Sequence, residues 1–74
     1  MARARIVSDP KIMHGQPVVA GTRIPVELIL DHLAEGYSGE DIIVEYPQLT
    51  KSDIRAAIRY ASRLVAQNAT RKAK

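Results

Sequence analysis

Apolar residues recur at helical spacing between Thr50 and Gln67. At about 100° per residue, they gather on one side of a helix: Ile54, Ala57, Ile58, Ala61, Leu64 and Val65. Cations recur every fourth residue on another side: Lys51, Arg55, Arg59 and Arg63. Thr50, with Asp53 three residues later, is the expected N-terminal cap. The pattern predicts a helix that docks its apolar face on a small core and offers a slowly winding basic stripe to an acidic partner.

Two shorter helices are expected before this long one. The first begins at Pro25, which suits a first helical turn, and ends at the glycine Gly36. Its expected apolar stripe is Val26, Ile29, Leu30 and Leu33. The second begins at Ser38, with Asp41 placed as in a capping box, and ends before Pro47. The residues expected to be buried there and in the following turn are Ile42, Ile43, Tyr46 and Leu49.

The N-terminal third predicts a small β element. Residues 3–8 alternate weakly between polar and apolar, which is typical of a short strand, and residues 11–13 form a second short strand or a turn. Residues 17–19 and 22–24 flank a tight hairpin or bulge, in which Gly21 supplies a positive φ. Because so small an element is not stable alone, we expect it to pack on the helices or to pair with another chain.

These elements fit one domain, because 74 residues are too few for two. We divide the chain into an N-terminal β element and candidate dimerisation arm (1–24), a three-helix, DNA-binding-like domain (25–67) and a basic, flexible tail (68–74). The predicted fold class is mainly α, a three-helix helix-turn-helix bundle with a small N-terminal β element. Chains this short often gain stability by forming dimers.

Charge changes from segment to segment. Residues 1–24 hold four cations and one anion, residues 25–50 hold six anions and no cation, and residues 51–74 hold seven cations and one anion. An acidic middle therefore precedes a basic end. In the first segment, Arg3 and Arg5 are expected to blunt an exposed edge strand, and the alternative is a basic arm that lies along DNA.

The basic stripe of the long helix has two interpretations. One is a solvated helix face, the usual environment of surface arginines. However, like charges at this spacing repel by about 0.2–0.5 kcal/mol per pair, and acids of the shorter helices or a phosphate backbone would relieve that repulsion. If this helix enters a major groove, Ser52 and Arg55 near its start are the candidates for base contacts. The candidates for phosphate contacts are Lys51, Arg59 and Arg63.

Other chemistries have weaker support. The chain has no cysteine, and its two histidines, His14 and His32, lie far apart without further ligands at metal spacing, so we expect no metal site. Nothing positions a nucleophile, and the chain offers little room for a pocket, so we expect neither an enzyme nor a cofactor or small-molecule substrate. No apolar run approaches the roughly 20 residues that span a bilayer, and the N-terminus lacks the apolar core of a signal peptide. We therefore expect a soluble, cytoplasmic protein without a membrane partner.

Two runs of motifs resemble a known family. The run from His14 to Val26, HGQPVVAGTRIPV, carries the signature GxPVxxGTRIPV, and the run from Gly36 to Tyr60 carries GYSGEDI, YPQLT and DIRAAIRY. Over roughly residues 5–65, this order is similar to the bacterial and archaeal domain of unknown function 433 family. The resemblance implies a homeodomain-like three-helix fold with an N-terminal β element, often dimeric. Members are commonly encoded beside a PIN-like ribonuclease and are regarded as VapB-type antitoxins.

Within the first run, five residues form a structural motif: Gly21, Thr22, Arg23, Ile24 and Pro25. We favour a structural role, in which Gly21 makes the turn, Ile24 fills the core and Pro25 starts the helix. Arg23 would then be solvated or paired with Glu27. The alternative is that Arg23 contacts a nucleic-acid backbone or a carboxylate of a partner.

Together, the basic stripe and the resemblance favour a small DNA-binding regulator of a type II toxin–antitoxin (VapBC-like) module. Such a protein binds operator DNA as a homodimer and neutralises a PIN-like ribonuclease toxin, for example by placing an arginine on the carboxylates of the nuclease site. The candidate residues for that partner contact are Arg63, Arg71, Lys72 and Lys74. The alternative is a protein-interaction or dimerisation module with no nucleic-acid role, in which acids of a second copy cover the stripe.

Overall fold

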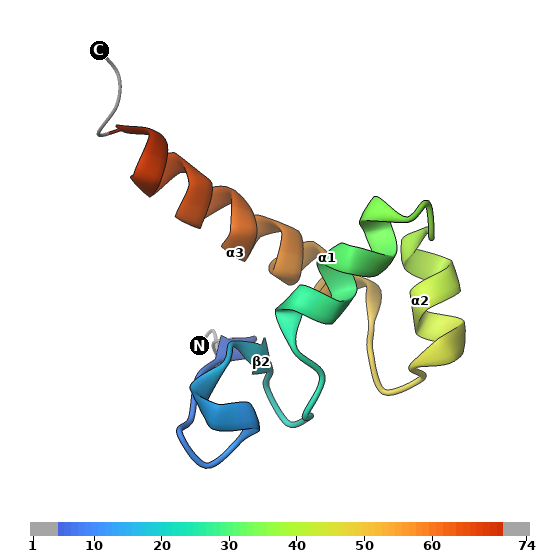
Figure 1. Cartoon of the computed structure of the whole chain (residues 1–74). Coiled ribbons are helices and arrows are strands. Elements are labelled where there is room, and N and C mark those ends of the chain that lie inside the picture. Colours follow the sequence, from blue (N-terminus) through green and yellow to red (C-terminus); the bar gives the residue numbers. More distant parts are fainter. Residues whose placement is uncertain (1–4, 71–74) are drawn as a thin grey trace.

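The computed structural model describes residues 5–70, without the side chains of residues 69 and 70. Its elements are β1 (Ile6–Val7), the 3-10 turn η1 (Met13–Gly15), β2 (Val18–Val19), α1 (Val26–Ala34), α2 (Gly39–Glu45) and α3 (Lys51–Thr70). The predicted fold class is confirmed, because three helices accompany a two-stranded antiparallel sheet. Figure 1 shows α1 and α2 beside the first turns of α3, with the β element below them.

The core lies where the β element, α1, α2 and the start of α3 meet. Its buried residues are Val19, Ile24, Val26, Ile29, Ile42, Leu49, Ile54 and Ala57. Ile29 and Ile42 are fully buried, and Leu49 fills the core from the α2–α3 turn, as predicted. The other apolar residues expected on α1 and α2 pack only partly against this cluster: Leu30, Leu33, Ile43 and Tyr46.

Local signals end α1 and begin α2 where the sequence places them. Gly36 follows α1 with φ +100°, and Ser38 forms the expected capping box with Asp41 at the start of α2. In that box, the backbone N–H of Asp41 donates to Oγ of Ser38 at 3.0 Å, and the N–H of Ser38 donates to Oδ2 of Asp41 at 2.9 Å. Pro25 caps α1 in an extended conformation rather than starting it, so Val26 is the first helical residue.

The β element is smaller than predicted and paired differently. Only Ile6–Val7 of the expected strand over residues 3–8 forms β1, and residues 3 and 4 lie outside the described part of the chain. β1 pairs with β2 in the register Ile6↔Val19 and Val7↔Val18. The expected hairpin is reduced to one bridge, between Val18 and Pro25, across a turn in which Gly21 has φ +81°. β2 thus has β1 on one side and the bridge to Pro25 on the other, and both of its residues are buried.

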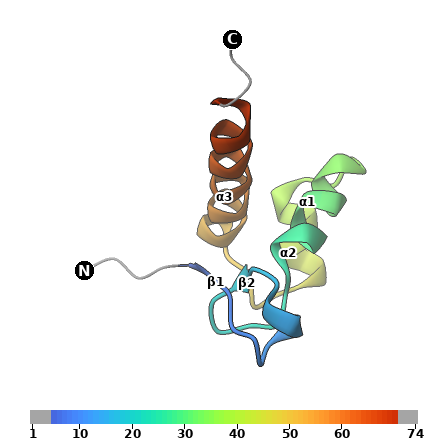
Figure 2. The ribbon, with the colours of Figure 1, turned by 60° about the vertical axis from the view of Figure 1, so that its left-hand side comes forward.

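The long helix was predicted to dock its apolar face on the core, and the structure shows this for only part of that face. Ile54 and Ala57 are buried, whereas Ile58, Leu64 and Val65 are 46%, 44% and 65% exposed. α3 has 20 residues, but α1 and α2 have only nine and seven, so the body ends before α3 does. Figures 1 and 2 show the second half of α3 projecting from the molecule. α3 also begins one residue after Thr50 and continues past Gln67 to Thr70.

Candidate nucleic-acid interface

The start of α3 is fixed by one carboxylate, that of Asp53. Its Oδ2 accepts a hydrogen bond from the backbone N–H of Thr50 at 3.0 Å, and the N–H of Asp53 donates to Oγ1 of Thr50 at 3.1 Å. Its Oδ1 accepts a hydrogen bond from Nη1 of Arg5 at 3.2 Å. Asp53 is only 7% exposed. The one acid of α3 is therefore turned inward, where it caps the helix and holds the segment before β1.

The predicted basic stripe lies on the outside of α3. Its residues, together with Ser52, are all exposed: Lys51, Ser52, Arg55, Arg59 and Arg63. Nζ of Lys51 lies 3.6 Å from Oε2 of Glu40, and because both side chains are mostly in solvent this pair contributes little stability. Among residues 5–70, no acid lies within ion-pair distance of Arg55, Arg59 or Arg63. Three arginines on this face are thus available to an anionic partner.

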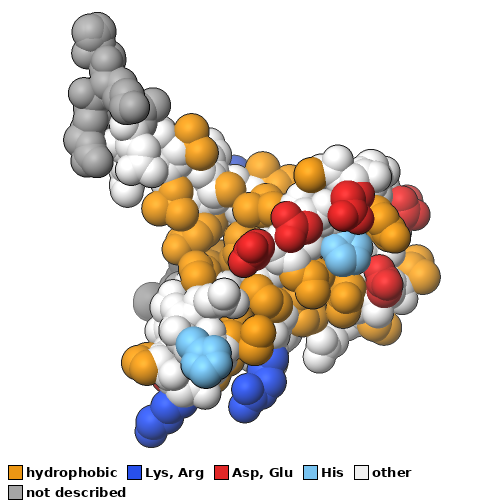
Figure 3. Space-filling model, viewed as in Figure 1, with side chains coloured by type: hydrophobic (Ala, Val, Ile, Leu, Met, Phe, Trp, Pro, Cys, Tyr) orange, Lys and Arg blue, Asp and Glu red, His pale blue; other side chains and the backbone are white. Residues whose placement is uncertain are grey.

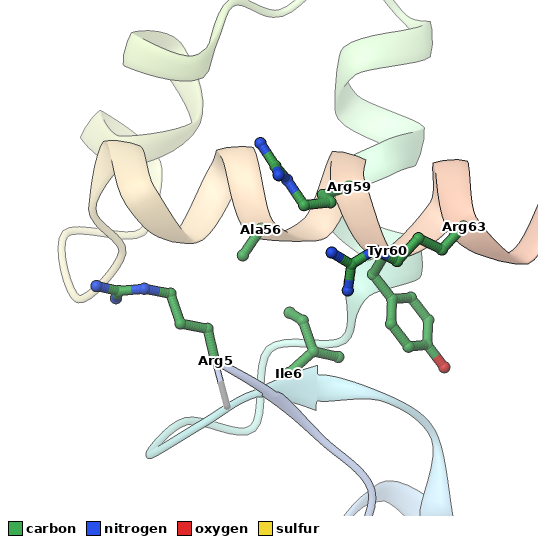
Figure 4. A pocket seen from close by; sticks show the side chains of 6 residues that line it. All are labelled: Arg5, Ile6, Ala56, Arg59, Tyr60 and Arg63. Atoms are coloured by element: carbon green, nitrogen blue, oxygen red, sulfur yellow. The ribbon is translucent and has the colours of Figure 1, made fainter. Parts of the chain in front are cut away.

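The stripe winds from one side of α3 to the other, so its two ends face different hollows. Lys51 and Arg55 line a hollow between the starts of α2 and α3, beside Ser38. Arg59 and Arg63 line a second hollow of about 270 Å³ between α3 and β1, beside Arg5. Figure 4 shows the side chain of Arg63 above Ile6 and that of Arg59 directed away from β1. An extended backbone could follow this surface, whereas the guanidinium groups do not converge on a single point.

The segment from Gly21 to Pro25 has the structural geometry that we favoured. Oγ1 of Thr22 donates to the carbonyl oxygen of Val19 at 2.8 Å and accepts from the N–H of Ile24 at 3.0 Å, which closes the turn. Ile24 is 7% exposed. Arg23 is exposed and, within the described residues, forms no ion pair with Glu27. Arg23 is therefore solvated in a single chain.

Acidic side chains form a separate ridge along α1. Glu27, Asp31 and Glu35 follow one another at helical spacing and are exposed, and Figure 3 shows acidic side chains in a row over this helix. Within residues 5–70, no cation pairs with any of them. The same region holds no group of three His, Asp or Glu side chains that could bind a metal ion. The ridge is therefore an acidic surface separate from the unpaired arginines.

Two residue pairs of this surface were missed by sequence reasoning. The ion pair of Arg5 with Asp53 joins residues 48 positions apart, and that of Lys51 with Glu40 joins two helices. The one available signal was that Asp53 is the only acid in the basic last segment. Four further candidates lie outside the described residues. They are the partner candidates Arg71, Lys72 and Lys74, and Arg3 of the N-terminal segment.

The fold and this surface together define a class of protein. It is a small three-helix domain with a two-strand β element and a cationic outer helix. The family model described as "Protein of unknown function (DUF433)" matches residues 6–61, and the chain belongs to this family. A crystal structure of a DUF433 member protein from Anabaena variabilis ATCC 29413 has a TM-score of 0.80 and 29% identity, and the match covers 88% of this chain and 64% of that one.

A curated relative is similar in sequence as well. The uncharacterized protein y4eO of Sinorhizobium fredii (strain NBRC 101917 / NGR234) is 42% identical over 60 residues, which are 81% of this chain. These residues are 27% of that relative, so the chain spans about a quarter of its length. Neither relative has a described activity in its name. Within residues 5–70, no helix is long and apolar enough to cross a membrane.

Proposed function

We propose that this protein is an antitoxin-like DNA-binding regulator of a type II toxin–antitoxin (VapBC-like) module. It binds operator DNA as a dimer through the outer face of α3 and neutralises a PIN-like ribonuclease toxin. It acts by binding rather than by catalysis. The observation that carries the proposal is that the outer face of α3 carries four cations, Lys51, Arg55, Arg59 and Arg63, and no exposed acid, because the single acid of the helix is turned inward onto Arg5 and the cap.

The position of α3 after a short turn supports a helix-turn-helix role. α2 ends at Glu45 and α3 begins at Lys51, as in domains whose later helix enters the major groove. Ser52 and Arg55, in the first turns of α3, are then the candidates for base edges, and Lys51, Arg59 and Arg63 are the candidates for the phosphate backbone. Two such helices in a dimer would occupy successive major grooves about 34 Å apart.

A binding assay with the upstream DNA of the protein's own gene tests this proposal. We expect Arg55→Ala/Arg59→Ala to weaken binding at least tenfold and to remove the preference for that DNA over a scrambled sequence. Lys11→Ala/Arg23→Ala is the matched control, because it removes the same charge from the exposed turns of the β element. With three phosphate contacts per chain, the slope of log K against log salt should be about −5 for a dimer. Equal losses in both double variants would contradict a specific role for α3.

Toxin neutralisation is tested separately. A basic segment that places an arginine on metal-binding carboxylates can block an acidic nuclease site. The candidates are Arg63 and the tail residues Arg71, Lys72 and Lys74. We expect the neighbouring gene product to copurify with the full chain and its ribonuclease activity to be inhibited. A chain truncated after Gln67 should lose most of this inhibition, and full inhibition by the truncated chain would rule out the tail.

The exposed apolar residues of α3 favour a second candidate, a protein-interaction or dimerisation module without a nucleic-acid role. Ile58, Leu64 and Val65 are too exposed to serve the core of a single chain. Under this alternative, the chain forms a stable complex with protein while the salt-dependent DNA binding described above is absent. The DNA-binding assay therefore distinguishes the two candidates.

A further inference from the structure

An apolar groove separates the second half of α3 from the first half of α1. It has a volume of about 400 Å³, and its apolar lining includes Pro17, Val26, Leu30, Tyr60, Ala61 and Leu64. Figure 3 shows hydrophobic side chains filling the corner between the projecting helix and the body. The groove has one apolar wall on each helix and is open to solvent along its length.

The projecting part of α3 supplies the complementary shape. Leu64 lines the groove and is 44% exposed, and the neighbouring Val65 is 65% exposed. Burial of an exposed aliphatic side chain is favourable, so this face gains stability from a partner that covers it. Each chain thus offers both an open apolar groove and a free apolar helix end.

Charge at the two places is complementary as well. Glu27 and Asp31 form the acidic rim of the groove, and Glu35 continues it along α1. The four residues after α3 include three cations, Arg71, Lys72 and Lys74. A helix end that enters the groove of another copy would bring these cations to the acidic ridge.

We propose that this groove is the interface between two copies of the chain. The copies are related by a two-fold axis, their α3 helices run antiparallel, and each helix end lies in the apolar groove of the other. A two-fold dimer fits this surface, because each chain carries both the groove and the helix end that fills the groove of the other chain. Both grooves are therefore filled at once. The three cations of residues 71–74 are the candidates for contact with the acids of the other copy.

This pairing leaves the basic stripe outside. Arg59 lies about 160° from Ala61 around the helix axis, given about 100° per residue, so the two face opposite directions. That the two basic faces of the dimer bind one DNA molecule rests on the proposed function. The dimer interface itself does not rest on it. The same tail cations are the candidates for toxin contact, and the two contacts exclude each other because they need the same side chains.

Sedimentation equilibrium of the full chain without DNA tests the proposal. We expect a dimer whose dissociation constant rises at least tenfold in Leu64→Glu/Val65→Glu. Val44→Glu is the matched control, because Val44 is 81% exposed on α2, outside the groove lining, and its replacement should leave the dimer unchanged. The milder Leu64→Ala/Val65→Ala should weaken the dimer in the same direction with the helical circular dichroism retained. A monomer at all concentrations, or a dimer that neither double variant weakens, would overturn the interface.

Charge reversal tests the proposed arrangement of the two copies. Glu27→Lys/Asp31→Lys and Arg71→Glu/Lys72→Glu should each weaken the dimer, and the chain that combines all four changes should recover at least part of the loss. Failure to recover would contradict the contact of the tail with α1. Normal dimers that do not bind the upstream DNA would refute the proposed function while leaving this interface intact.

Discussion

His32 of α1 contacts Glu45 of α2, with 3.3 Å between Nε2 of the ring and Oε1 of the carboxylate. Its Nδ1 lies 2.9 Å from the carbonyl oxygen of Leu28 and must donate there, because a carbonyl oxygen only accepts. The ring also meets the rings of Tyr37 and Tyr46 edge-on, with centroids 4.8 and 5.9 Å away. This histidine therefore joins α1 to α2 and to the turns that follow both helices.

We expect His32→Ala to lower the free energy of unfolding by about 1–2 kcal/mol, because it removes a hydrogen bond and two aromatic contacts. Glu45→Gln should cost less, since the Glu45 side chain is half exposed. Urea unfolding followed by circular dichroism measures both variants. Their double variant should be less destabilised than the sum of the two, and strict additivity would show that the two side chains do not interact.

Asp53 should matter far more than the arginine with which it pairs. Asp53→Ala removes the carboxylate that accepts from the N–H of Thr50 and from Arg5, and keeps only the cap bond from the backbone N–H of residue 53 to Thr50, so we expect a loss of about 2 kcal/mol. Arg5→Ala should cost less than about 1 kcal/mol, since the side chain of Arg5 is 53% exposed. Lys51→Ala, which removes a cation from an exposed pair at the same helix start, is the control and should be nearly neutral in urea unfolding. Equal effects of Asp53→Ala and Lys51→Ala would contradict the role of the buried carboxylate.

The helix limits were predictable because their signals are local. Ser38 with Asp41, Thr50 with Asp53, and Gly36 at positive φ each act within a few residues, and the structure shows all three arrangements. The side of α3 that carries cations was predictable too, since helical periodicity alone decides it. These local rules also place the stripe of the candidate interface on the outside of the molecule.

Features that depend on distant residues were not predictable in the same way. Periodicity shows which face of α3 is apolar but not how far α1 and α2 extend beneath it, so the exposure of Leu64 and Val65 was missed. The pairing of β1 with β2 depends on burial of Val18 and Val19, for which a two-residue strand gives no pattern. The ion pair of Arg5 with Asp53 likewise arises only when the segment before β1 meets the start of α3.

The capping box of α2 should make stability depend on acid pH. The backbone N–H and the hydroxyl of Ser38, in that order, lower the pKa of Asp41 below its ordinary value. The folded state therefore binds this proton less tightly than the unfolded state, so the stabilisation is complete above the ordinary pKa and is lost as pH falls through the lower folded value.

Asp41→Asn should accordingly be less stable than the wild type at pH 7, and the difference should shrink as the pH is lowered toward 3. Urea unfolding across this range measures the difference. Glu35→Gln, at an exposed acid of the α1 ridge without an ion pair in the described residues, is the control and should show no comparable change. A difference between Asp41→Asn and the wild type that stays constant with pH would contradict the role of the carboxylate in the cap.

Two glycines, three residues apart, should respond to alanine in opposite directions. Gly36 has φ +100°, and an added Cβ would meet nothing within 4 Å, so Gly36→Ala suffers only from the left-handed backbone. We expect it to lower stability by about 1 kcal/mol. Gly39 begins α2, and its added Cβ would lie 3.6 Å from Cγ2 of Ile54, an ordinary contact. Gly39→Ala should therefore raise stability by about 0.4–1 kcal/mol through the reduced entropy of the unfolded chain.

Thermal and urea unfolding of the two variants beside the wild type test this pair, with Gly21→Ala as a second left-handed position. Gly21 has φ +81° and open space around its added Cβ, so its substitution should resemble that of Gly36 and not that of Gly39. Destabilisation by Gly39→Ala would mean that Ile54 cannot accept the extra methyl group, and that the start of α2 packs on α3 more tightly than a 3.6 Å approach implies.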